Sequence, residues 1–187
     1  MHRVRRNNGR YRALFVLFTL FGLLSFTPVA YASPFGQGVF GANVPFGSLT
    51  SIAIALGSNP SVALTPNGST FVGSGSHTIT VTSTDVVGYN LYIYAANGTD
   101  MTSGSSTIAA SSNGTQAALA LNSWGYNIDG SANYLGITSS PKLLKSAVGP
   151  YKSGNTTAVT YGALTDATVP AGSYTVSVTY TAVAMNE

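Results

Sequence analysis

The sequence predicts an exported all-β protein whose body is an antiparallel β-sandwich of the immunoglobulin-like, Greek-key type. A basic and then apolar leader opens the chain. After it come roughly eight to ten short segments of strand-like composition, separated by Gly, Pro and Asn-Gly turn signals. No apolar segment with helical periodicity follows the leader. This combination is typical of two stacked sheets with one dry and one wet face each, and a barrel is the alternative that the strand number leaves open.

Residues 1–32 have the organisation of a signal peptide. Five of the eight basic residues precede an apolar run over residues 13–26. Ala30-Tyr31-Ala32 then supplies the small-x-small cleavage pattern, so cleavage after Ala32 is expected. An uncleaved anchor is the alternative, because residues 13–32 carry no charge and are about long enough to cross a bilayer. In both cases we expect the rest of the chain to be secreted or at the cell surface, with membrane contact through the leader alone.

Beyond the leader, the charge balance of the chain is faintly acidic. Residues 33–187 contain three lysines against four aspartates and one glutamate. This balance removes the basic footprint of a nucleic-acid-binding protein. The chain also has no cysteine, so an exported domain of this length must be held together by its core rather than by disulfides.

The longest alternating segment, residues 172–184 (GSYTVSVTYTAVA), is expected to be the strand around which the sandwich is built. Successive side chains of a strand point to opposite faces. One face of this segment carries Tyr174, Val176, Val178, Tyr180 and Ala182, and the other carries hydroxyl residues. We therefore expect the first face to join the core and the second to meet solvent.

Other segments repeat this pattern at shorter length. Strands are predicted over residues 50–56, 61–64, 77–83, 88–95, 107–110, 124–129, 133–138 and 156–164. In the segment 88–95 we expect Tyr89, Leu91 and Ile93 to face the core, which leaves Tyr92 and Tyr94 as a partly exposed stripe. Residues 116–121 are the one place where a helical turn is expected. Residues 141–151, which hold two prolines and two of the three lysines that follow the leader, are interpreted as an irregular loop.

Residues 33–47 (SPFGQGVFGANVPFG) form an arm that precedes the sandwich domain, residues 48–187. The arm is rich in Gly and Pro, carries Phe35, Phe40 and Phe46, and fits neither a helical nor a strand period. Large aromatic side chains are seldom left in water. One interpretation is that they plug the edge of their own domain. The other is that the arm pairs with a neighbouring subunit, since strand addition is a common mode of recognition.

The order of these segments resembles a group of secreted β-sandwich proteins of small-genome and Gram-positive-type bacteria. The matching parts are SLTSIAIAL, the threonine-rich strand leading into GYNLYIYA, the single SWGY, and the closing VPAGSYTVSVTYTA, which cover most of residues 49–184. In pattern the chain is also similar to WxL-type surface domains and to pilus- and spore-coat-type subunits. In the latter, a PAGxY-like turn often precedes the last strand, as Pro170-Ala171-Gly172 and Tyr174 do here.

This resemblance implies a surface protein but no site. A WxL pair is absent, because Trp124 is followed by Gly125 and Tyr126. Peptidoglycan binding of that kind is therefore not implied, and no functional residue is carried over.

No catalytic, cofactor or metal site is predicted. His77 is the single histidine after the leader and there is no thiol, so a zinc site lacks its ligands. No serine stands in a GxSxG context, and His77 is interpreted as a surface residue at a strand end. Residues 127–133 (NIDGSAN) alternate oxygen-bearing side chains but carry one carboxylate, which favours a turn over a calcium loop. Four of the five acidic residues lie beside turn residues, where a structural Asp is common, rather than as a catalytic pair.

The candidate contact residues are aromatic. The residues singled out for ligand or assembly contacts are Phe35, Phe40, Phe46, Tyr92, Tyr94, Trp124 and Tyr126. Trp124 with Tyr126 has two interpretations, a sugar-stacking platform or a plug in the sandwich core.

The expected function is that of a secreted or cell-surface structural or adhesive subunit without enzymatic activity. Its sheet edges and its N-terminal arm are expected to associate with copies of itself or with other envelope proteins. The alternative is a carbohydrate-binding module of the cell envelope, which contacts cell-wall polysaccharide through Trp124 and exposed tyrosines.

Overall fold

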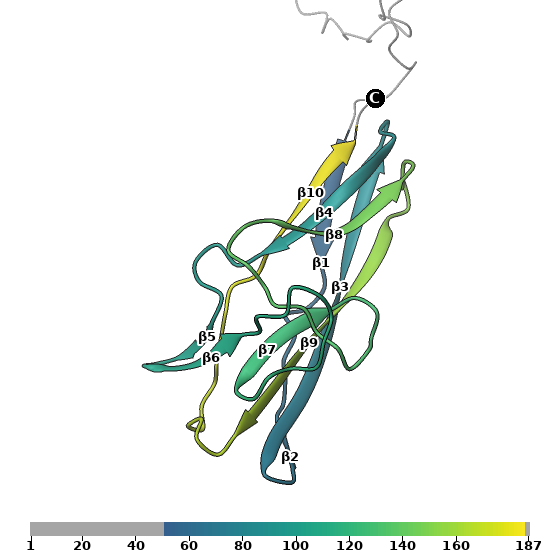
Figure 1. Ribbon diagram of the computed structural model, residues 1–187. Coiled ribbons are helices and arrows are strands. Elements are labelled where there is room, and N and C mark those ends of the chain that lie inside the picture. Colours follow the sequence, from purple (N-terminus) through teal and green to yellow (C-terminus); the bar gives the residue numbers. More distant parts are fainter. Residues whose placement is uncertain (1–50, 186–187) are drawn as a thin grey trace, which may run out of the picture. The chain divides into compact units, whose positions relative to one another are not determined.

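The computed structural model describes residues 51–185, which form two stacked β-sheets around one core (Figure 1). The predicted leader and the arm, residues 33–47, lie outside the described residues. The strands are β1 (Ser51–Leu56), β2 (Thr65–Asn67), β3 (Thr70–Thr84), β4 (Gly88–Tyr94), β5 (Met101–Ser103), β6 (Ser106–Ala110), β7 (Ser123–Asn127), β8 (Lys142–Val148), β9 (Asn155–Asp166) and β10 (Thr179–Met185). No helix occurs in this part of the chain, which confirms the all-β prediction. Residues 51–185 accordingly contain no helix that could span a membrane.

The two sheets differ in width. The larger sheet has seven strands in the order β1-β3-β9-β7-β6-β5, with β2 also paired to β3, and the smaller sheet has the order β10-β4-β8. All ladders are antiparallel except that between β6 and β7. The orders β1-β3-β9-β7 and β4-β10 correspond to A-B-E-D and C-F of an immunoglobulin sandwich. Within the described residues no strand takes the position of strand G, beside β10.

The core-facing side of strand β3 carries glycines near the start of the strand and large apolar residues near its end. Ile79 and Val81, near its end, are fully buried beneath the smaller sheet. Gly73 and Gly75, near its start, lie on the same face and carry no side chain there. Residues 61–64 cross at this point, and a Cβ on Gly75 would lie 2.1 Å from the Ser61 carbonyl oxygen. The glycines thus admit a loop where the second sheet does not reach.

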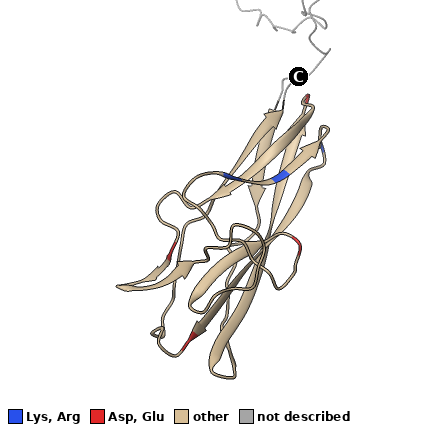
Figure 2. Cartoon of the chain, viewed as in Figure 1, with Lys and Arg blue, Asp and Glu red and all other residues tan. Residues whose placement is uncertain are grey.

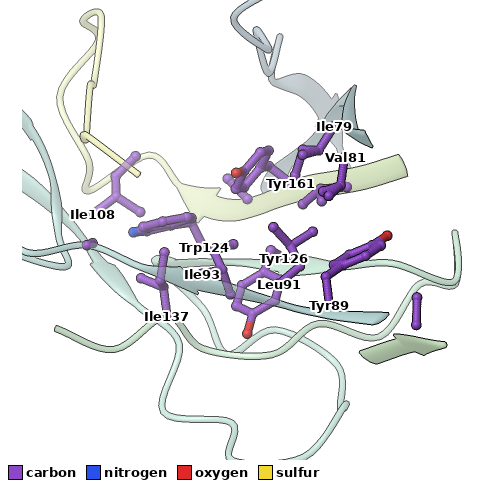
Figure 3. Close-up of a cluster of buried hydrophobic side chains, with 14 residues drawn as sticks. Ile79, Val81, Tyr89, Leu91, Ile93, Ile108, Trp124, Tyr126, Ile137 and Tyr161 are labelled. Atoms are coloured by element: carbon purple, nitrogen blue, oxygen red, sulfur yellow. The ribbon is translucent and has the colours of Figure 1, made fainter. Parts of the chain in front are cut away.

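The core gathers the apolar faces that the sequence pattern predicts (Figure 3). Tyr89, Leu91 and Ile93 of β4 are all buried, and Tyr92 and Tyr94 on the opposite face are half-buried, as expected. From the larger sheet, β7 and β9 contribute large aromatic rings to the same space. Trp124 is 0% exposed, and its indole Nε1 donates to the Thr99 carbonyl oxygen at 3.1 Å. The polar end of the Trp124 ring is therefore satisfied where it meets a loop.

Several predicted elements differ from the observed ones. Residues 61–64 are the crossing loop rather than a strand, and β2 follows them. Residues 116–121 form no helical turn, because Asn113 Nδ2 donates to the carbonyls of Ala117 and Ala118 and holds them in an extended path. Residues 133–138 contribute only isolated bridges, at Tyr134 and Leu135.

The two most informative differences concern β8 and β10. The region 141–151, interpreted as a loop, contains β8, whose alternation is broken by a bulge opposite Leu91 and Tyr92. Of the long segment 172–184, only the part from Thr179 onward pairs as a strand. Tyr174, Val176 and Val178 still turn toward the core, so the alternation correctly predicted burial but not pairing.

We expect Gly75→Ala to lower the free energy of unfolding by about 2 kcal/mol, because the added methyl group would collide with the backbone of the crossing loop. Gly114→Ala is the matched control, since nothing lies within 4 Å of a Cβ at that position. There the substitution should be neutral or slightly stabilising. Chemical denaturation of both variants measures the difference, and equal stabilities would show that the loop does not press on β3.

Candidate functional site

The ends of the two sheets are the places where the fold leaves backbone groups without a strand neighbour. The larger sheet ends at β5 on one side and at β1 on the other, where the short β2 continues the edge along β3, and the smaller sheet ends at β10 and β8. An exposed sheet edge presents N–H and C=O groups that can pair with another chain, and proteins commonly protect such edges. The four edges of this body are treated differently.

The edge at β8 is protected by charge and by irregularity. Lys145 Nζ reaches across to the larger sheet and donates to Asn155 Oδ1 at 3.0 Å and to Thr157 Oγ1 at 3.1 Å. Lys142 Nζ donates to the Gly114 carbonyl oxygen at 3.2 Å. Lysines and a bulge are two devices that discourage strand addition. The edge at β8 is therefore a poor acceptor.

The edge at β5 is covered by the chain itself. Thr102 and Thr175 exchange two backbone hydrogen bonds, of 2.9 and 3.0 Å, as the chain passes on its way to β10. Because β5 is only three residues long, this contact occupies the middle of its edge.

The remaining edges, β1 and β10, lie close together, and no strand within residues 51–185 pairs with their outer sides (Figure 1). We call this side of the sandwich the β1–β10 flank, defined by Ile52, Ile54 and Leu56 of β1 and Tyr180, Ala182 and Ala184 of β10. The three β1 residues pair with buried β3 residues and so point to the core side of the sheet. Ile54 is nevertheless 37% exposed and Leu56 55% exposed. The flank is therefore an opening at the edge of the core, which the smaller sheet covers only in part.

The flank is also without charge. Neither β1 (SIAIAL) nor β10 (TYTAVAM) contains a charged residue. Figure 2 shows lysine on β8 and none on β1 or β10. Among the four sheet edges, this flank alone combines open backbone, apolar side chains and the absence of lysine.

A cluster of His77, Tyr161 and Tyr180 ties β10 to the larger sheet. His77 Nε2 lies 3.0 Å from the Tyr180 hydroxyl, and the hydroxyls of Tyr161 and Tyr180 are hydrogen-bonded. The His77 ring also packs against both tyrosine rings, with centroids 5.8 Å and 5.6 Å away. Strands β3, β9 and β10 are thereby joined at one point between the sheets. The interpretation of His77 as a surface residue at a strand end is corrected, since it lies within β3 and faces inward.

The titration of the cluster follows from its burial. Desolvation lowers the pKa of His77, which favours the neutral imidazole. Desolvation also raises the pKa of Tyr161 to about 12 and that of the neighbouring Tyr126 to about 12. The pKa of Tyr180 is raised by burial and by the nearby Tyr161. At neutral pH the cluster is an uncharged hydrogen-bonded unit, suited to holding strands together.

The predicted aromatic contact residues occupy three different environments. Phe35, Phe40 and Phe46 lie outside the described residues. Tyr92 and Tyr94 lie on the outer face of the smaller sheet, where Tyr92 stands between Thr181 and Leu143. Trp124 and Tyr126 are in the core, at 0% and 1% exposed, so they are not available as a surface platform. Of their two interpretations, the core plug is the one that the geometry supports.

The polar loops hold themselves together. In residues 127–133, Asn127 Nδ2 donates to the carbonyls of Ser131 and Asn133, and the Ser131 N–H donates to Asp129 Oδ1. This is the hydrogen-bonding of a turn, as predicted for this segment. At Asp166, the carboxylate accepts from the Thr168 N–H and from Asn122 Nδ2.

The residues of the flank were not singled out from the sequence. The signal that was present is the absence of charge in two strand segments, one near each end of the body. That signal becomes meaningful only once the topology places both segments at sheet edges.

No protein-family model matches the chain, and no curated protein matches it in sequence. Among solved structures, the chain is similar to one from a chaperone–tip adhesin complex described as vital for synergistic activation of CFA/I fimbriae biogenesis. The sequence identity is 13% and the TM-score 0.48. The similarity covers 73% of this chain and 42% of that chain, so this chain spans less than half of the length of that neighbour. A similarity at this level carries no functional assignment.

The raised tyrosine pKa values give an expected loss of stability in alkali. The folded state keeps these tyrosine hydroxyls protonated, whereas the unfolded chain releases their protons near pH 10. The free energy of unfolding is therefore unaffected below that pH and falls as the pH rises toward 12. Tyr180→Phe removes one of the buried hydroxyls, and its stability should fall less steeply with pH. Urea denaturation at about pH 8 and about pH 11 measures this, with Tyr92→Phe on the outer face as the matched control. An unchanged slope for Tyr180→Phe would contradict the assignment.

Proposed function

We propose that the protein is a secreted or cell-surface structural or adhesive subunit that acts through association at its β1–β10 flank and not through catalysis. The observation that supports this best is the unequal protection of the sheet edges. Lysines and a bulge protect β8, whereas β1 and β10 carry neither. A solitary domain gains nothing from an open, uncharged edge, whereas a subunit that accepts a strand requires one.

The exterior of the body suits this role. Outward positions of β3 and β10 are largely Ser and Thr, and few charges interrupt the surface (Figure 2). Neutral hydroxyl-bearing faces can pack against other copies or against polysaccharide without the cost of desolvating charges. Export through the predicted leader places such a subunit outside the cell.

Ile54→Lys is expected to weaken self-association roughly ten-fold or more, because the lysine places a charge in the opening that the partner strand fills. Light scattering coupled to size-exclusion chromatography of the exported protein over a range of concentrations measures the association. Val148→Lys is the matched control, since Val148 is 82% exposed and lies on β8, away from the flank. A wild-type protein that stays monomeric at every concentration, or a Val148→Lys loss equal to that of Ile54→Lys, would refute the proposal.

A carbohydrate-binding role is the second candidate, and the outer face of the smaller sheet is the observation that favours it. Tyr92 and Tyr94 are half-buried there, on a face to which β4, β8 and β10 add no charged outward residue beside them. Partly exposed aromatic rings on a flat sheet offer stacking surfaces to sugar rings. Trp124 plays no part in this version, because it is buried.

For this candidate, Tyr92→Ala should weaken pull-down by cell-wall glycan roughly ten-fold. Thr181→Ala, which alters the cross-strand neighbour of Tyr92 without removing a ring, should leave the pull-down unchanged. Wild-type protein that glycan does not retain, or equal retention of all three proteins, excludes the tyrosine face as a sugar site.

A further inference from the structure

The free backbone groups of β1 belong to the residues that point into the flank. The Gly57 N–H donates to the Thr78 carbonyl oxygen at 2.8 Å, in the same register as the β1–β3 ladder. Successive residues of a strand direct their backbone groups to opposite sides. Ser51, Ala53 and Ala55 therefore bond to β3, whereas Ile52, Ile54 and Leu56 direct their N–H and C=O groups to the open edge. Within residues 51–185 no other strand pairs with this edge.

An occupant of this edge must satisfy three conditions. It must be extended, so that it can pair with β1, and it must present an apolar side chain at every second position, so that it fills the opening. It must also be uncharged, because a charge in this opening would be desolvated without a partner. Across the opening β10 offers the small side chains of Ala182 and Ala184, which leave room for large ones.

Residues 40–46 of the arm (FGANVPF) meet these conditions. The arm as a whole follows no period, but this part of it alternates. Apolar side chains stand at Phe40, Ala42, Val44 and Phe46, and Gly41, Asn43 and Pro45 stand between them. No residue of the segment is charged. It has the composition of a strand with one fully apolar face.

Pro45 determines the orientation of the pairing. In an antiparallel ladder, the arm residues that face the core also direct their backbone groups to β1, so the missing N–H of Pro45 points to the other side. In a parallel ladder the intervening residues would bond to β1, and Pro45 would leave a gap. The segment therefore fits the edge of β1 in the antiparallel orientation.

The length of the connection between the arm and β1 argues against the arm filling the β1–β10 flank of its own copy. Four residues, 47–50, separate Phe46 from Ser51. A hairpin with this four-residue loop pairs Phe46 with Ser51, which turns the apolar face of the arm to the outer side. A three-residue loop would consist of Ser-Leu-Thr without the glycine that such loops favour, and a five-residue loop removes Phe46 from the strand. A second copy has no such restriction on register.

We propose that residues 40–46 of one copy pair antiparallel with β1 of a second copy and insert Phe40, Ala42, Val44 and Phe46 into its β1–β10 flank. This inference rests on the proposed function and specifies its partner. The donor and acceptor surfaces are different, so each copy can accept one arm and donate another.

Disulfide trapping tests this directly, because the chain has no cysteine of its own. Ile54→Cys protein is mixed with Ala42→Cys or Val44→Cys protein under mild oxidation and analysed on non-reducing gels. A disulfide-linked dimer is expected from at least one of these mixtures, since both cysteines then face the same opening. Asn43→Cys is the matched control, since it lies on the opposite face of the arm and should not link. The double variant Ile54→Cys/Val44→Cys should give a ladder of linked copies.

A second measurement keeps the test independent of disulfide geometry. Val44→Asp should weaken association by at least as much as Ile54→Lys, and Asn43→Asp should change it little. If Ile54→Lys weakens association while no cysteine pair links and Val44→Asp has no effect, this inference is overturned and the proposed function stands. A double variant that links only within one chain overturns it as well, in favour of closure by the same copy. If the wild-type protein does not associate at all, the proposed function itself has failed.

Discussion

The smaller sheet is too narrow for the larger one, and this constraint governs the rest of the structure. Three strands, β10, β4 and β8, must cover a core face to which β1, β3, β9 and β7 all contribute. At the start of β3, which the smaller sheet does not cover, a loop crosses over Gly73 and Gly75 instead. No described segment fully covers the core-facing side of β1. Ile54 and Leu56 therefore stay exposed, although their cross-strand partners, Val81 and Ile79, are fully buried.

The cluster of His77, Tyr161 and Tyr180 explains why the opening persists. Tyr180 is held by side chains from β3 and β9, so β10 is fixed to the larger sheet close to where its pairing with β4 begins. A strand fixed in this way cannot easily move over to cover β1. The opening is therefore preorganised, and an incoming strand would not have to displace an element of the fold, which reduces the free-energy cost of binding.

Much of the fold was accessible from the sequence because alternation reports burial. The faces of β4 and of residues 174–182 were predicted correctly, since each has a clean period of two. Strand β8 was missed because its bulge breaks the period, which places Leu143 outward and Lys145 inward. His77 was misplaced because its inward orientation depends on two tyrosines more than eighty residues away in sequence. Local patterns contain no information on such partners.

The residues of the candidate site could likewise not be identified from local sequence patterns alone. A sequence identifies aromatic residues, and Trp124 and Tyr126 were singled out for that reason, but burial is decided by what packs over them. The topology decides whether a strand lies at a sheet edge, because a segment such as SIAIAL has the same sequence pattern at the centre of a sheet and at its edge. The arm, with its three phenylalanines, was interpreted either as a plug for the edge of its own domain or as a strand for a neighbouring subunit, whereas the acceptor became visible only from the strand order.

The unequal protection of the edges also bears on the kind of assembly. If both sheets ended in open, uncharged strands, copies could pair edge to edge in several ways and aggregate. Lys142 and Lys145 on β8 and the Thr102–Thr175 contact on β5 leave one acceptor flank among the described residues of each copy. A single acceptor combined with a donor located elsewhere on the chain makes a head-to-tail contact, which gives rings where the rotation closes and filaments where it does not. In either form the outer face of the smaller sheet, with Tyr92 and Tyr94, remains free of the contact and open to other ligands.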